Sequence, residues 1–143
     1  MEYPDLIAPT RALLDDYSRD TPWVMENVPD APLINTIRLC GFMFGRDLYR
    51  HRLFEASPGL QLRPPAHPRH TKPGSRAGHW QPGTVISVSG HCAPMTEARK
   101  QMDISWTNRE ELGEAIPPYY TEYIGKQILE HLGLETPELE RVG

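Results

Sequence analysis

A carboxyl group and two guanidinium groups occupy positions in this sequence that suit catalysis or binding. Glu26 follows the short apolar run 23–25, which predicts a buried strand, and precedes a loop that contains Pro29. Open α/β sheets bind their ligands at such strand ends. Arg50 and Arg52 flank a histidine in a second predicted strand. A carboxyl group in a dry pocket can serve as a general acid, and arginine binds phosphate with a planar, permanently charged fork.

Each of these groups also has a plainer interpretation. A Glu-Asn pair before a proline is commonly a turn, and two arginines around a histidine on a strand are commonly a solvated face. On that interpretation Glu26, Arg50 and Arg52 carry no chemistry. Companion motifs elsewhere in the chain are needed to distinguish the two interpretations.

Helices and strands in three regions of the chain must hold these groups in place. Strands are predicted at 23–25 and 48–54, both in the first region. They follow an N-terminal helix that Pro9 is expected to kink, whose apolar residues at helical spacing are Leu6, Ile7, Leu13, Leu14 and Tyr17. The three regions are 1–55, 56–95 and 96–143.

The middle region is irregular and basic. It holds seven of the fifteen prolines and five of the eleven glycines, which predicts a loop-rich segment with short strands such as 84–89. No acidic residue lies between Glu55 and Glu97. The rest of the chain holds all nineteen acidic residues and eleven of the fifteen cationic ones. A basic insert in an acidic body suits an anion-facing surface, although a solvated loop without acids is the alternative. We predict DNA contacts by its four cationic side chains, Arg63, Arg69, Lys72 and Arg76.

The third region is predicted to be helical. Thr96 and Thr107 are predicted N-caps, and Thr107 with Glu110 fits a capping box. A last helix is predicted to open at the prolines 117–118 and to end at Gly133. Its apolar face is predicted to comprise Tyr120, Ile124, Ile128, Leu129 and Leu132.

Several segments together resemble the carboxy-terminal part of the cytosine-C5 DNA methyltransferases, especially their compact bacterial and phage branch. Residues 22–29 (PWVMENVP) look like the family's Glu-Asn-Val motif at the end of a central strand. Residues 39–45 and 50–55 (LCGFMFG and RHRLFE) look like the segment that leads to its Arg-x-Arg strand. Residues 113–125 (GEAIPPYYTEYIG) resemble the closing Gly-Asn-Ala-Val-Pro motif, and 5–11 (DLIAPTR) is similar to the same branch. Their order along the chain is more specific than any one of them.

The resemblance implies an α/β fold that corresponds to the second half of a Rossmann-like, S-adenosylmethionine-dependent methyltransferase domain. Residues 1–55 would be a partial catalytic domain, 56–95 a small irregular DNA-recognition insert, and 96–143 the closing helices of the catalytic domain. The implied activity is transfer of a methyl group from S-adenosylmethionine to C5 of a flipped cytosine in duplex DNA.

Roles for single residues also follow from the resemblance. In this family a cysteine thiolate adds to C6 of cytosine while a carboxyl group holds the ring nitrogen N3, and Glu26 matches that carboxyl group. Arg50 and Arg52 would hold the flipped base and a backbone phosphate. Asn27 would fix the loop at the strand end. Weak contacts with the cofactor would come from Glu114, which stands where many members have asparagine, and from Ala115 and Ile116.

Two features of the family are missing from this sequence. There is no Phe-x-Gly-x-Gly loop to cradle the cofactor, and no Pro-Cys pair to supply the nucleophile, since no cysteine precedes Cys40. We interpret Cys40 as a small buried residue and leave the role of Cys92 open. We therefore expect a split enzyme, in which a second chain supplies the amino-terminal half, or a chain that self-associates. The alternative is a non-catalytic relative that binds DNA or protein. Without its first half the sheet would expose a strand edge and an apolar face, which favours a partner.

Histidines in the middle region leave a further hypothesis open. His67 and His70, with His79, His91 or Cys92, are acceptable zinc ligands. Because the spacing is loose and exposed loop histidines are more common, we predict no metal.

The bulk composition places the chain in solution. No apolar run approaches the length of a membrane span, and no secretory signal is expected at the amino terminus. Two cysteines make no disulfide framework. We expect a cytoplasmic protein of a bacterial or phage-infected cell.

Overall fold

The fold combines helices with one small sheet, and the computed structural model describes residues 5–76 and 79–135. The ends of the first and third predicted regions, and two residues of the middle one, lie outside this part of the chain. Eight elements follow one another: α1 (Ile7–Tyr17), β1 (Val24–Asn27), β2 (Thr36–Leu39), the 3-10 helix η1 (Gly41–Phe44), β3 (Arg52–Ala56), α2 (Met95–Met102), α3 (Arg109–Glu114) and α4 (Pro118–His131).

The sheet has the strand order β1-β3-β2, with β3 antiparallel to both neighbours. Consequently β1 and β2 run parallel to each other on either side of β3. Glu26 pairs with Phe54, and Leu39 pairs with Arg52. The chain is thus a mixed α/β protein. Within the described ranges β1 pairs with β3 alone, so its outer edge is free.

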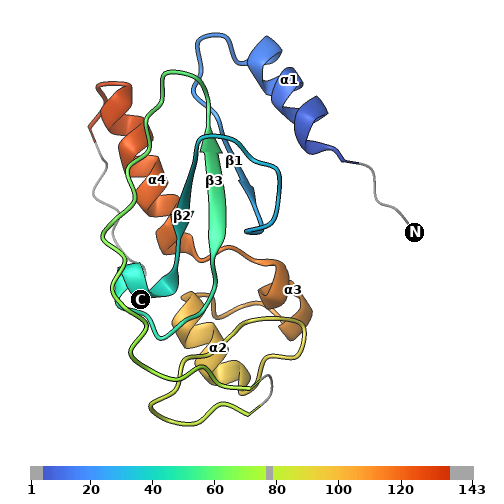
Figure 1. The fold of residues 1–143 in the computed structure, drawn as a ribbon, viewed down its shortest axis with the longest axis vertical. Coiled ribbons are helices and arrows are strands. Elements are labelled where there is room, and N and C mark those ends of the chain that lie inside the picture. Colours follow the sequence, from blue (N-terminus) through green and yellow to red (C-terminus); the bar gives the residue numbers. More distant parts are fainter. Residues whose placement is uncertain (1–4, 77–78, 136–143) are drawn as a thin grey trace.

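One apolar core lies between the sheet and α4, which runs along it in Figure 1. Ile37 and Phe54 from the sheet pack against Tyr120 and Ile124 from α4. The predicted last helix is confirmed: Pro118 takes the first helical position, where a missing N–H costs nothing, and Gly133 has φ +68° just past the end. Leu132 was wrongly placed on the apolar face, since it is 45% exposed.

A second core lies beyond one end of the sheet, where Figure 1 shows α2 and α3. Leu48 belongs to this core with Met102 and Leu112. The predicted strand 48–54 is therefore wrong in its first half, because Leu48 turns into the second core and forms only an isolated bridge to Ile86. The strand itself begins four residues later, at Arg52.

Two further strand predictions need correction. The expected strand at 84–89 reduces to isolated bridges at Val85 and Ile86, since their partners Gly74 and Leu48 belong to different segments. Strand β2 was not predicted, because its four residues alternate between exposed and buried and give too short a pattern to stand out.

The predicted N-caps in the third region are also wrong. Helix α3 is capped by Asn108, whose side chain accepts from the N–H of Glu111 and completes a capping box one residue later than expected. Asparagine is the stronger cap, which explains the choice over Thr107. Helix α2 begins after Pro94 without a side-chain cap, and Thr96 lies inside its first turn.

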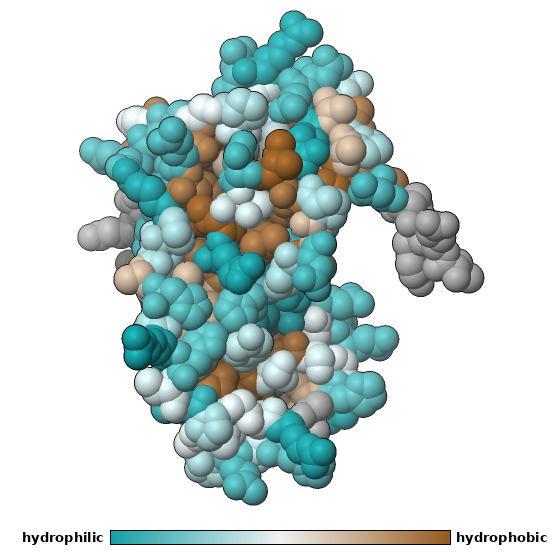
Figure 2. Space-filling model, in the orientation of Figure 1, coloured by the Kyte–Doolittle hydropathy of each residue, from teal (hydrophilic) through white to brown (hydrophobic). Residues whose placement is uncertain are grey.

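Helix α1 stands apart from both cores (Figure 1). None of its residues is buried, and Leu6, Leu13 and Tyr17 around it are 58–83% exposed. Figure 2 shows brown, apolar atoms in the upper half of the molecule, where α1 and the sheet lie. The expected kink at Pro9 is absent, because Pro9 occupies the first turn, where backbone N–H groups have no partner within the helix.

Of the helices in the described ranges, none has the length and apolar character needed to cross a membrane.

Candidate functional site

Glu26 and Arg52 lie together on one face of the sheet. Phe54 is the cross-strand partner of Glu26, and Arg52 precedes Phe54 by two residues, so both side chains emerge on the same side. The Nε of Arg52 lies 3.0 Å from Oε1 of Glu26. Their side chains are 16% and 30% exposed, which makes this a partly buried ion pair. Strand pairing, not proximity in sequence, brings the two predicted residues together.

The carboxyl group of Glu26 holds its proton more tightly than an ordinary glutamate. Burial raises its pKa, and the positive charges of Arg52 and Arg50 only partly oppose this effect. Oε1 is buried and makes no hydrogen bond within the described structure, because its close contact with Arg52 lacks hydrogen-bond geometry. A desolvated carboxyl group with a raised pKa can donate a proton or a hydrogen bond to a ligand nitrogen.

Arg50 is buried and braces two distant segments. Its Nη1 donates to the carbonyl oxygen of Val88 at 2.8 Å, and its Nη2 donates to those of Gly113 at 2.8 Å and Ala115 at 2.6 Å. Burial lowers its pKa to about 10, so the side chain stays charged at neutral pH. These three bonds occupy both terminal nitrogens, and the buried Nε is without a partner in the residues described.

An open cleft of ≈ 560 Å³ lies beside these groups. Pro29, from the loop that follows Glu26, lines one part of it, and Arg50 and Arg52 line another. Residues 87–90 of the middle region and Gly113 complete the lining. Residues from the predicted segments 22–29, 50–55 and 113–125 therefore meet the predicted insert at one depression.

Comparison of the chain with protein-family models, with curated proteins and with solved structures finds no match.

Asn27 and the predicted cofactor residues differ in how far their side chains and carbonyl groups are already engaged. The side-chain oxygen of Asn27 accepts from the N–H of Val28 at 2.8 Å, an arrangement that holds the strand-end loop. The carbonyl oxygen of Ala115 accepts a hydrogen bond from Arg50, and Ile116 packs against the core under α4. Glu114 alone of the three predicted cofactor residues has an exposed side chain. This segment therefore offers at most one wall of a cofactor site.

The four predicted DNA-binding side chains are all exposed, but they are not equally available. Arg63 pairs with Glu130 at 3.0 Å, and Lys72 pairs with Asp47 at 2.5 Å. Arg69 and Arg76 make no ion pair with any residue in the described ranges. The latter two are thus the most available for phosphate.

The structure brings together a group of possible metal ligands, although the sequence predicted no metal. Cys40, His51, His67 and His70 each offer a ligand atom, and these atoms all lie within 4.8 Å of one another. His67 and His70 stood out by their spacing, but their predicted companions in the middle region take no part in this group. No local sequence signal joins Cys40 to the histidines. Cys40 is fully buried, as predicted.

Proposed function

We propose that this chain is part of a cytosine-C5 DNA methyltransferase and supplies its base-binding carboxyl group and its recognition segment. The observation that carries the proposal is the pairing of Glu26 with Arg52 beside a cleft that three motif-like segments and the basic insert line together. Methylation of cytosine at C5 requires a proton-bearing carboxyl group, held by a cation, at a place that a flipped base can enter.

In this proposal Glu26 binds the N3 edge of cytosine. Its raised pKa lets the carboxyl group share a proton with N3 as negative charge develops in the ring, while Arg52 fixes the carboxyl group in place. Arg50 acts differently from the sequence-based expectation: its bonds to Val88 and Gly113 join the insert to the closing motif, which shapes the cleft. Arg50 thereby positions the wall that the base would meet.

The cysteine nucleophile and the cofactor loop would come from another segment or chain. S-Adenosylmethionine would supply the methyl group, and Glu114 would lie at one side of it. Two features of the described structure suit such a partner: the outer edge of β1 is free, and α1 exposes Leu13 and Tyr17. Free edges and exposed apolar faces favour association.

Duplex DNA would be held through the insert. Arg69 and Arg76 are exposed and unpaired within the described residues, and the insert that carries them lines the cleft at 87–90. Contacts with phosphate at these positions would orient the duplex, and the flipped base would enter the cleft.

The test is transfer of labelled methyl groups from S-adenosylmethionine to unmethylated DNA, with the chain alone and with lysate of its native host. We expect transfer that depends on the chain and is lost in Glu26→Gln. Glu110→Gln, a matched change at an exposed helix position, should leave transfer intact. DNA binding with no transfer under either condition would instead identify a non-catalytic binding module.

A further inference from the structure

The end of β2 and the start of β3 bring a thiol and an imidazole together. Leu39 and Arg52 are the last paired residues of the two strands, and the register continued by one step places Cys40 opposite His51. The next residue, Gly41, lies close against Leu48, where an added Cβ would be 2.6 Å from the Leu48 carbonyl oxygen. Cross-strand neighbours have side chains on the same side of the sheet.

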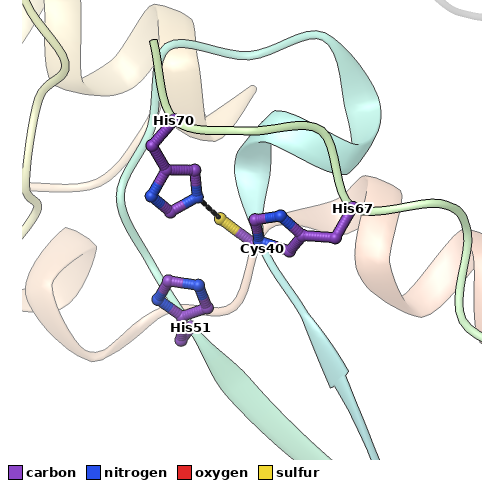
Figure 3. Close-up of side chains that lie close together, drawn as sticks. All are labelled: Cys40, His51, His67 and His70. Atoms are coloured by element: carbon purple, nitrogen blue, oxygen red, sulfur yellow. Dashed lines mark hydrogen bonds between the residues drawn. The ribbon is translucent and has the colours of Figure 1, made fainter. Parts of the chain in front are cut away.

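Two histidines of the middle region complete the group. In Figure 3 His67 and His70 reach toward the sulfur of Cys40 from a neighbouring loop, and His51 lies next to them. The Cys40 Sγ lies 3.6 Å from Nε2 of His70. We propose that Cys40, His51, His67 and His70 bind one Zn²⁺ ion, which fastens the middle region to the ends of β2 and β3.

The spacing fits a tetrahedral ion. Zinc bonds of about 2.3 Å to sulfur and about 2.0–2.1 Å to nitrogen give a sulfur–nitrogen edge of about 3.6 Å and a nitrogen–nitrogen edge of about 3.4 Å. The observed Cys40–His70 separation of 3.6 Å already matches the first edge. The widest pair of ligand atoms is at most 4.8 Å apart, and His67 and His70, whose movement would close that gap, are exposed.

A hydrogen bond prepares His67 for a cation. Nδ1 of His67 lies 2.7 Å from the carbonyl oxygen of Pro68. A carbonyl oxygen only accepts, so Nδ1 carries the proton and Nε2 keeps its lone pair, which is the usual outer arrangement of a metal-bound histidine.

Ring contacts hold His51 and His70 within this group. The rings of His51 and His67 stack with their centroids 5.8 Å apart. The ring of Phe42 stacks on His70 with centroids 4.3 Å apart and restricts its orientation. Cysteine sulfur and histidine nitrogen are both ligand types that zinc binds.

A bound metal ion would order residues 61–73 of the middle region. Residues 61–73 contain no helix or strand, so backbone hydrogen bonding of regular elements does not order them. An ion bound to four side chains from three segments would fix this loop, and with it the direction of Arg69. Four protein ligands leave no open position, which is the pattern of a structural and not a catalytic zinc site.

Titration of the metal-free, full-length chain with Co²⁺ under reducing, oxygen-free conditions tests the proposal. We expect one Co²⁺ per chain, visible bands of tetrahedral cobalt, a thiolate-to-cobalt charge-transfer band, and displacement of cobalt by Zn²⁺. His67→Ala and His70→Ala remove exposed side chains and should each weaken binding by more than about 100-fold, because loss even of an outer-shell partner costs about 10–100-fold. His79→Ala and His91→Ala are the matched controls and should bind as the wild type does.

Binding that is not stoichiometric, a cobalt spectrum without the thiolate band, or equal losses in the control variants would overturn the zinc site. Cys40 is buried, so Cys40→Ser serves only to assign the thiolate band, and the exposed histidine variants carry the test. The assay uses neither DNA nor S-adenosylmethionine. Failure here therefore leaves the proposed methyltransferase function standing, and the reverse also holds.

Discussion

Replacing Arg50 with alanine is expected to destabilise the fold by about 2–4 kcal/mol. The side chain is 4% exposed and donates to the carbonyl oxygens of Val88, Gly113 and Ala115. Hydrogen bonds from a charged group contribute roughly 1.5–3 kcal/mol each, so three at the lower end give about 4.5 kcal/mol. Part of this is offset, because the variant no longer buries a charge. The remainder is a large share of the ~5–15 kcal/mol that stabilises an ordinary domain.

The assay is urea denaturation at neutral pH, followed by circular dichroism. Arg50→Lys keeps the charge and some of the bonds, so it should fall between alanine and the wild type. Arg38→Ala, a matched change at an exposed strand position, should stay within about 0.5 kcal/mol of the wild type. If Arg50→Ala costs no more than Arg38→Ala, the three bonds do not hold the insert to the closing motif, and the positioning role of Arg50 is refuted.

Three further predictions follow from the charged groups. Because the pKa of Glu26 is raised in the folded state, its contribution to stability grows as pH falls through the folded-state pKa toward the unfolded one. Glu26→Gln should remove this pH dependence without lowering the urea midpoint at neutral pH. A clear drop of the midpoint at neutral pH would contradict this prediction. The buried carboxylate of Glu55 accepts hydrogen bonds from Arg11 of α1, which lower its pKa. Its contribution to stability is therefore present above the unfolded pKa and lost as pH falls through the folded one. Glu55→Gln should cost about 2 kcal/mol at neutral pH, and a stability profile that matches the wild type would refute the role of this pair. Replacing Arg69 and Arg76 with alanine should weaken DNA binding and reduce the slope of log K against log salt by about 0.9 per lost contact. Arg109→Ala should leave this slope unchanged. Equal slopes in all variants would show that the insert does not contact DNA.

Local signals in the sequence predicted some elements well. The last helix was found because Pro118 and Gly133 mark its ends and its apolar residues repeat at helical spacing. The cap of α3 was misplaced by one residue because Thr107 and Asn108 are both good caps and differ only in strength. Strand β2 escaped notice because four residues carry too little periodicity.

Long-range features of the site could not be predicted in the same way. The side-by-side placement of Glu26 and Arg52 depends on the register of β1 and β3, which no local pattern specifies. The burial of Arg50 depends on carbonyl groups 38–65 residues away. The grouping of Cys40 with His51 likewise arises from strand register, and sequence reasoning considered only the histidines and the cysteine of the middle region.

Nucleoside mass spectrometry of DNA incubated with S-adenosylmethionine, host lysate and the chain tests the central claim most directly. We expect 5-methylcytosine to form when the wild-type chain is added and not when Glu26→Gln replaces it. Methylation at an exocyclic amine of adenine or cytosine, or 5-methylcytosine at the same level with Glu26→Gln, would contradict it.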